Sequence, residues 1–379
     1  MKKLQVVIGL VSGLLLASAA SAENLTIQWW VTGWPAGTGW LPKIAASGGQ
    51  NGSAALIYQI ATGDATFHYW DGQMVYTVPN EFDWDGPYSV TSSGEVGHQP
   101  SIAMVACEIP ACTGLYFNSD VIQVHQGGQD NGSELWYRTG VDPGLETTWA
   151  AAHSYDEGYN PTVAVDQTGG TSTTTTVVEV HQGGVDLSAL WYHVGTLTYS
   201  ATTVTVTWGP SHLVGFSGYA PTVSIANGIV VLVAQGSAGT LLYSIGTADT
   251  STNTINNWSA TDNYDSGYNP SVSVQSCGAG GATFGCDFVV VEAHQEGNTT
   301  GSLMYRLGKL HYGSGGSAPT SISWSPNADT NYAKGCYPSV GLMTYGTNTT
   351  TTYPLVESHS DACGGPAVVH TAWGYVQLD

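Results

Sequence analysis

The feature that most constrains this chain is an internal repeat. Residues 177–195 read V-V-E-V-H-Q-G-G-V-D-L-S-A-L-W-Y-H-V-G, and related stretches begin at Val121 and Val289. Weaker copies begin at Leu56, Ile229 and Leu355. A period of roughly 50 to 70 residues is the size of one blade in a repeat protein, so the chain is predicted to be built from similar units.

A second marker recurs between the copies. It is a corner of glycine, usually with an aromatic residue, followed by proline and a short alternating run, as in Gly158-Tyr159-Asn160-Pro161 and Gly267-Tyr268-Asn269-Pro270. Such clusters of Gly, Asn and Pro mark turns. The prolines of these corners are Pro42, Pro100, Pro161, Pro221, Pro270 and Pro338.

Each period contains four short runs rich in β-branched and aromatic residues. In the period that starts at Pro221, the runs are Thr222–Ile225, Ile229–Val233, Leu241–Ile245 and Ile255–Trp258. Gly, Asn and Ser bound these runs, as they bound strands. Four-stranded units repeated around an axis form a β-propeller, so the predicted fold is all-β.

The two ends of the chain are predicted to form the last blade together. Residues 338–379 supply only three strands, and the run T-I-Q-W-W-V near the N-terminus resembles the fourth strand of a blade. Pairing the two would leave no open sheet edge at the seam. We therefore predict a six-bladed β-propeller whose last blade is closed by the N-terminal strand. The predicted blades are 42–96, 100–157, 161–217, 221–266, 270–334, and 338–379 with 24–34.

Residues 1–22 have the pattern of a signal peptide. Lys2 and Lys3 precede an apolar run, and Ala20-Ser21-Ala22 fits a cleavage site. The run is shorter than the ~20 residues that span a bilayer, so no membrane insertion is expected. The prediction is a secreted or periplasmic protein in which residues 23–379 form a single β-propeller domain.

The net charge of the chain limits the classes of partner that it is expected to bind. The net charge is −21, and loss of Lys2 and Lys3 would make it −23. Such a surface repels phosphate backbones, so nucleic acid is excluded as an expected partner. Anionic membranes and polyanionic glycans are disfavoured for the same reason.

Six cysteines in an exported chain indicate disulfides. Two pairs flank short connections between strands, and the remaining two cysteines would then pair with each other. No cysteine spacing resembles a zinc cluster, so neither a metal nor a cofactor is predicted. The predicted disulfides are Cys107–Cys112, Cys277–Cys286 and Cys336–Cys363.

Strand alternation gives the repeated acid and histidine two interpretations. Glu179 and His181 lie two residues apart and therefore on one side of their strand. A buried pair would have to be satisfied by itself or by the next blade, which would make it a structural tie between blades. Glu292 and Glu357 recur at the same position. In the other interpretation, the histidines contribute to a ligand site.

The ligand-binding interpretation rests on the ends of the second strands. There a glutamine is followed by glycines, which leave the backbone bare, and the corner tyrosines lie at the same face of the ring. The tryptophans of the third strands offer flat apolar surfaces for sugar rings. The candidate ligand-binding residues are His125, Gln126, Trp136, Tyr159, His181, Gln182, Trp191, Tyr219, Gln235, Tyr268, His294, Gln295 and His359.

The motifs V-E-V-H-Q, L-W-Y-x-x-G and Y-D-x-G-Y-N-P resemble repeats of secreted bacterial β-propellers of the lectin and sialidase-like type. The resemblance concerns architecture. A sialidase is disfavoured, because that family needs three arginines around its substrate and this chain offers only Arg138 and Arg306.

The sequence is compatible with three functions, and it favours a protein that is not an enzyme. The first is multivalent binding of glycans or glycoconjugates at repeated shallow sites on one face. The second is a glycoside hydrolase or polysaccharide lyase with a central pocket, for which paired carboxyls are needed. The third is an envelope scaffold that binds proteins. The candidate carboxyls for the second are Asp64, Glu95, Asp156 and Asp265.

Overall fold

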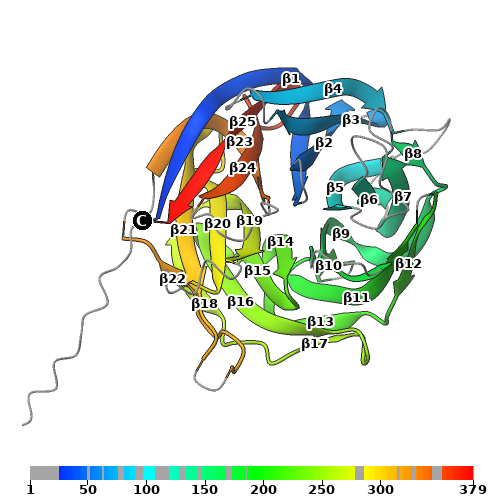
Figure 1. The fold of residues 1–379 in the computed structure, drawn as a ribbon, viewed down its shortest axis with the longest axis vertical. Helices are drawn as coiled ribbons and strands as arrows, with labels where there is room; N and C mark the ends of the chain where they lie inside the picture. The colour runs from blue at the N-terminus through cyan, green and yellow to red at the C-terminus, as the bar shows by residue number, and fades with distance from the viewer. Residues whose placement is uncertain are drawn as a thin grey trace, which may run out of the picture.

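The structure is a computed structural model in which β-sheets are arranged in a ring (Figure 1). The part of the chain that it describes contains strands β1 to β25 and one 3₁₀ turn, Ser237–Gly239, so the chain is all-β. The described residues are 25–48, 52–61, 64–75, 81–90, 97–106, 119–127, 133–142, 147–167, 173–184, 186–200, 202–277, 286–313, 316–326, 330–343 and 352–378.

The strands of the first half of the chain form three antiparallel groups, which we call groups one to three. Group one is Trp40–Ser47 of β1 (Leu25–Ser47), β2 (Ser53–Ala61), β3 (Asp64–Val75) and β4 (Glu81–Ser89). Group two is β5 (Gly97–Ala106), β6 (Ser119–Gly127), β7 (Glu134–Asp142) and β8 (Thr148–Trp149). Group three is the second half of β9 (His153–Val165), β10 (Thr174–Gly183), β11 (Ala189–Tyr199) and β12 (Val204–Trp208).

The second half of the chain follows the same plan in groups four to six. Group four is β14 (Tyr219–Ala226), β15 (Ile229–Gln235), β16 (Thr240–Asp249) and β17 (Thr254–Asn256). Group five is β19 (Tyr268–Ser276), β20 (Phe288–Gln295), β21 (Gly301–Leu310) and β22 (Ser323–Trp324). Group six is the second half of β23 (Thr330–Leu342), β24 (Thr352–Ser360), β25 (Ala367–Leu378) and Leu25–Gly39 of β1.

Before four of the proline corners, those of Pro161, Pro221, Pro270 and Pro338, the chain forms strand that the sequence did not predict. His153–Glu157 of β9 pairs with β7 before the strand crosses into group three, and the first half of β23 pairs with β21 in the same way. Separate strands β13 (His212–Ser217) and β18 (Asp262–Ser266) take this place beside β11 and β16. The residues before the corner therefore extend the outer part of one group rather than forming a loop.

Hydrophobic clusters lie between consecutive groups. The cluster between groups three and four, for example, combines Val178 and Val180 of β10 with Val223 of β14 and Leu232 of β15. Similar clusters join the other neighbours, including group six to group one through Val356 and residues of β1 and β2. Each fully buried valine or leucine contributes about 1.5 to 3 kcal/mol relative to exposure. The core of the protein therefore lies between the sheets.

The innermost strands form a continuous ring of contacts. β1 contacts β5, β5 contacts β9, and the series continues through β14, β19 and β23 back to β1. In Figure 1 the short strands β8, β12 and β17 lie toward the periphery, far from this ring.

The glycine of the L-W-Y-x-x-G motif makes room for an outer tryptophan. A Cβ added at Gly195 would lie 3.0 Å from the Trp208 ring, and a Cβ added at Gly308 would lie 3.0 Å from the Trp324 ring. Trp208 and Trp324 also stack on Tyr155 and Tyr264, which belong to the preceding groups. The tryptophans of the outer strands therefore pack into the contacts between groups.

Two of the three predicted disulfides are confirmed. Cys277–Cys286 joins β19 to β20, and Cys336–Cys363 joins the start of group six to the connection after β24. Cys107 and Cys112 lie outside the described residues. The predicted signal peptide, residues 1–22, also lies outside them, and within the described part no helix is long and apolar enough to cross a membrane.

Candidate functional site

The two sequence motifs meet at one end of each group. Gln182 pairs with Tyr159, Gln235 with Tyr219, and Gln295 with Tyr268, so each H-Q end lies beside a proline corner. The sequence predicted that these residues share a face, and the strand register confirms it.

The four candidate histidines are buried at this face. His125, His181, His294 and His359 retain 1 to 4% of their exposed surface. Each ring lies against the glycine of a proline corner. A Cβ added at Gly158 would lie 2.4 Å from Cδ2 of His181, and a Cβ added at Gly267 would lie 2.5 Å from Cδ2 of His294. The corner glycine is thus explained by the imidazole that covers it.

The repeated acid holds the histidine, as strand alternation predicted. Nδ1 of the imidazole lies 3.0 Å from Oε2 of Glu179 in group three, and the same distance separates His294 from Glu292. Group six repeats the pair with Glu357 and His359. The three carboxylates are completely buried, so each needs this partner and a second one.

A tyrosine from the preceding group lies beside each carboxylate. Tyr332, in the part of β23 that pairs with group five, donates a hydrogen bond of 2.9 Å to Glu357 in group six. Tyr155 and Tyr264 lie beside Glu179 and Glu292, and burial together with the neighbouring carboxylate raises both tyrosine pKa values well above normal. The Glu-His-Tyr sets therefore span the contacts between groups.

Group two has a neutral version of this arrangement. Gln123 replaces the glutamate, and its side chain lies 3.0 Å from Nδ1 of His125. Burial, with the nearby charge of His98, lowers the pKa of His125 to about 3. The neutral imidazole is therefore the stable form here, whereas the Glu357 carboxylate outweighs burial and raises the pKa of His359.

The glutamines tie the second strand of one group to the corner of the next. Oε1 of Gln182 accepts hydrogen bonds from the Ala220 backbone at 3.1 Å and from the Asn160 side chain. Oε1 of Gln295 accepts from the backbone of Tyr337 at 3.4 Å. Gln126 is buried at the corresponding position in group two, and Gln235 accepts from the Asn269 backbone.

The residues that directly precede the corner prolines have left-handed backbone conformations, and each has a φ between 43° and 56°. This region is unfavourable for residues with a side chain, except that Asn tolerates it better. The six residues are Leu41, Gln99, Asn160, Ala220, Asn269 and Tyr337.

These corners surround a small cavity at the mouth of the axis. The cavity has a volume of about 60 Å³ and is lined by corner prolines, the left-handed residues, Lys43 and Thr162. Ligand pockets usually measure about 300 to 1,000 Å³. No carboxylate is found among its lining residues. The described part of the axis mouth therefore lacks both the room and the acids of a hydrolase pocket.

The aromatic candidates keep more exposed surface than the histidines. Tyr219 is 42% exposed, whereas Tyr159, Tyr268, Trp136 and Trp191 are half-buried. The indoles lie across bare backbone. A Cβ added at Gly127 would lie 2.4 Å from Nε1 of Trp136, and one added at Gly183 would lie 3.1 Å from Nε1 of Trp191. The glycines after H-Q thus shape the positions of the tryptophans.

The two candidate carboxyls whose side chains the structure describes, Asp156 and Asp265, lie between groups and do not line the cavity at the axis. Asp265 contacts Arg306, with Oδ2 of the acid 3.3 Å from Nε of the guanidinium, at the contact between groups four and five. Asp156 lies at the contact between groups two and three. Asp64 lies in β3, where the structure describes the backbone only, and Glu95 lies outside the described residues. Arg138 is buried in group two and donates to the Val90 carbonyl.

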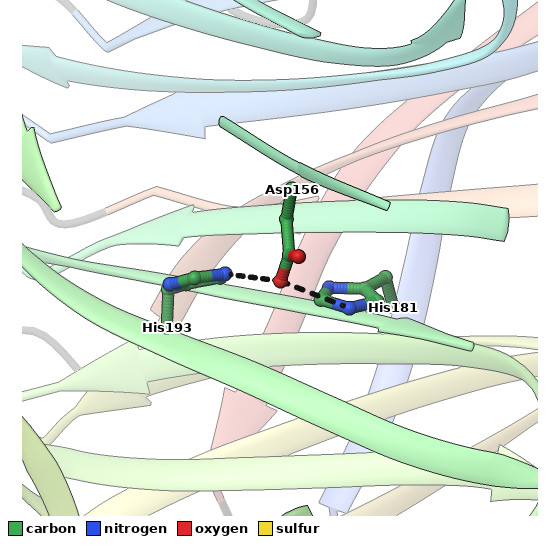
Figure 2. Close-up of side chains that lie close together, drawn as sticks. All are labelled: Asp156, His181 and His193. Atoms are coloured by element: carbon green, nitrogen blue, oxygen red, sulfur yellow. Dashed lines mark hydrogen bonds and ion pairs between the residues drawn. The ribbon is translucent and has the colours of Figure 1, made fainter. Parts of the chain in front are cut away.

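At the contact between groups two and three, three side chains form a cluster that the sequence does not predict (Figure 2). Oδ2 of Asp156 lies 2.8 Å from Nε2 of His193 and 3.6 Å from Nε2 of His181. Burial opposes ionisation of Asp156, but hydrogen bonds from His193 and the Glu157 backbone lower its pKa to about 2. Within the described ranges, this cluster is the group of side chains whose atoms are placed to hold a metal ion.

Tyr155, Tyr264 and His193, which were not among the candidate residues, carried a signal in the sequence. Tyr155 and Asp156 precede the corner glycine Gly158, and Tyr264 and Asp265 precede Gly267 at the same spacing. His193 follows Leu-Trp-Tyr, where the other strong copies have arginine. This substitution marks group three as different from its neighbours.

Comparison with known proteins shows the fold. No known protein family and no curated protein matches the sequence. Several solved structures of β-propellers are similar. The Aleuria aurantia lectin in complex with Fucα1-6GlcNAc is 12% identical, with a TM-score of 0.54, and the match covers 90% of this chain and 96% of the lectin. The chain therefore has the β-propeller fold.

Two glycoside hydrolases are similar to the same degree. The α-L-arabinanase of Penicillium chrysogenum, complexed with arabinobiose, is 11% identical with a TM-score of 0.53, over 93% of this chain and 99% of the enzyme. The α-L-arabinofuranosidase Arb93A of Fusarium graminearum is 12% identical with a TM-score of 0.51, over 94% and 98%. These structural neighbours are carbohydrate-active proteins of both kinds, a lectin and glycoside hydrolases.

Proposed function

We propose that this protein is an exported, six-bladed β-propeller that binds carbohydrate at several similar shallow sites on one face. The six strand groups are its blades, and Leu25–Gly39 of β1 is the strand that completes the sixth. The antiparallel pairing of this segment with β25, and of Trp40–Ser47 with β2, supports this architecture.

The observation that carries the choice of binding over catalysis is the small cavity in the described part of the axis mouth. Hydrolysis by paired carboxyls needs two acids about 5 to 9.5 Å apart around a substrate. None of the described residues that line the cavity of about 60 Å³ at the mouth is an acid. Asp156 and Asp265 instead lie between blades, where His193 and Arg306 contact them.

The proposed ligand contacts come from side chains that keep exposed surface at the proline-corner face. They are the indoles of Trp136 and Trp191, which offer flat apolar faces, and polar groups that pair with sugar hydroxyls. The buried histidines, with Gln126, Gln182 and Gln295, hold the positions of these side chains from below. The polar contributors are Tyr159, Tyr219, Gln235 and Tyr268.

Repetition compensates for weak single sites. A site with a Kd of about 1 mM supplies only about 4 kcal/mol. Several such sites that engage one glycan-bearing surface together gain avidity without any new contact. The net charge of −21 favours neutral over acidic glycans as partners.

A glycan array probed with the full exported protein tests this function. We expect binding to neutral glycans, and a loss of at least about tenfold in the double variant Trp191→Ala/Tyr219→Ala with an unchanged melting temperature. Tyr312→Ala is the matched control, because Tyr312 is 41% exposed but follows the opposite end of β21.

Other outcomes would replace the proposal. Cleavage of the bound glycans would identify a hydrolase or lyase, and failure to bind any glycan together with capture of an envelope protein would identify a scaffold. Export is tested separately by N-terminal sequencing of the protein from the periplasm or medium, which should begin at Glu23.

A further inference from the structure

The cluster of Asp156, His181 and His193 has an unusual arrangement of hydrogen-bond donors and acceptors. Nδ1 of His193 lies 2.9 Å from the Gly209 carbonyl oxygen, which can only accept, so this nitrogen carries a hydrogen. Nδ1 of His181 faces the buried Glu179 carboxylate at 3.0 Å and donates to it. Both rings therefore present Nε2 to the remaining partner, Asp156.

In neutral imidazoles of this tautomer, Nε2 is a lone-pair acceptor. Two such acceptors then face a carboxylate oxygen, and the three atoms lie within 4.8 Å of one another. Acceptors at these distances repel unless a positive charge lies among them. A proton on a ring or a metal ion can supply this charge.

The positions of the three atoms also fit a metal ion. Bonds of ~2.0 Å in a tetrahedral zinc site place neighbouring ligand atoms ~3.3 Å apart. The two observed separations from Oδ2 of Asp156, 2.8 and 3.6 Å, lie on either side of that value. Metal-binding histidines also typically donate their second ring nitrogen to a carboxylate or a backbone carbonyl, as His181 and His193 do.

We propose that Asp156, His181 and His193 bind one divalent transition-metal ion, Zn²⁺ or an ion with the same preference for two imidazoles and a carboxylate. The histidines are 1% and 5% exposed, while Asp156 is 28% exposed, so the ion enters from the side of the aspartate. Oδ1 of Asp156 accepts from the Glu157 backbone, which fixes the carboxylate orientation. A water molecule occupies the fourth, open position.

Group five provides an internal control for this proposal. His294 and Asp265 repeat the arrangement of His181 and Asp156, with Nε2 of His294 3.9 Å from Oδ2 of Asp265. Arg306 stands where His193 stands in group three, because it pairs opposite Glu292 as His193 pairs opposite Glu179. The Arg306 guanidinium supplies a permanent positive charge, so the pair of His294 and Asp265 needs no metal ion.

The test measures metal stoichiometry and affinity on the full chain without a histidine tag. The protein is stripped with a chelator and titrated with Zn²⁺ at pH 7.5 by calorimetry, and bound metal is counted by mass spectrometry after dialysis. We expect one tight equivalent per chain. His193→Arg should weaken it at least about a hundredfold while the protein stays folded, because group five already accommodates arginine at this position.

Two further variants keep the proposal falsifiable. Asp156→Asn keeps the size of the side chain and should also abolish tight binding, which covers the case in which His193→Arg fails to fold. Arg306→His should create a second equivalent in group five. Absence of a stoichiometric site in the wild type, unchanged affinity in His193→Arg, or no second equivalent in Arg306→His would overturn the proposal. Co²⁺ in the same site should give the visible spectrum of tetrahedral coordination.

Discussion

Groups four and five occupy equivalent places in the ring but use different chemistry at their contacts. In group five, Glu292 and His294 lie on the second strand, and Tyr264 reaches them from the preceding group. In group four, Leu232 and Ala234 occupy the corresponding sequence positions before Gln235. Val214 and Phe216 pack nearby. The same sheet geometry therefore forms with a polar set or with an apolar one.

This difference shows that the polar sets are not required for the ring to form. Where the glutamate is present, in groups three, five and six, histidine and tyrosine accompany it, whereas group two keeps the histidine beside Gln123 and group four lacks all three. A buried carboxylate without its partners is costly, so the glutamate depends on the histidine and the tyrosine. The comparison can be tested at three positions.

The largest effect is expected from breaking the unit in group five. Glu292→Ala removes the acceptor of His294 and the carboxylate beside Tyr264, and we expect a loss of about 3 to 5 kcal/mol in the free energy of unfolding. Denaturant unfolding measures it. The double variant Glu292→Leu/His294→Ala copies group four and should lose less than the single variant. A double variant that loses more would mean that the polar set itself stabilises the contact.

A smaller effect is expected at the corner glycine. In Gly267→Ala the new Cβ would lie 2.5 Å from the His294 ring and 3.0 Å from the Gln295 carbonyl, so we expect destabilisation of about 1 to 3 kcal/mol. Gly297→Ala, two residues beyond Gln295, is the control, because no atom lies within 4 Å of its Cβ. Thermal unfolding should separate the two variants, and equal melting temperatures would contradict the packing argument.

The third effect is the pH dependence of stability. It differs between a histidine with a neutral partner, His125, and one with a charged partner, His359. The pKa of His125 falls to about 3 on folding, so below pH 6.5 the unfolded chain binds a proton that the folded chain does not. Its contribution to stability is therefore lost as the pH falls, by about 2 kcal/mol at pH 5. The pKa of His359 is raised, so its contribution is present at low pH and is lost as the pH rises.

Chemical unfolding between pH 5 and 8 measures both contributions. His125→Gln should reduce the loss of stability on acidification relative to the wild type, and His359→Gln should increase it. The same sign of change in both variants would show that the partner of the imidazole does not control its charge.

The pattern of the sequence predicted much of the local structure. The four strands predicted after Pro221 correspond to β14 to β17, and the predicted meeting of the H-Q ends with the proline corners is confirmed by the register of Gln235 and Tyr219. These features follow from strand alternation and turn residues, which act over a few positions. The strands β13 and β18 before the corners were not predicted, because their pairing with β11 and β16 is a contact between segments that are distant in the sequence.

The sequence by itself determined the repeat, the alternation of the strands and the side of each strand on which Glu179 and His181 lie. Only the tertiary structure decided that Tyr155 of the preceding group approaches Glu179, and that Asp156 and His193 meet His181. The physical reason is that contacts between groups depend on how two twisted sheets face each other. Spacing within one copy of the repeat does not specify that arrangement.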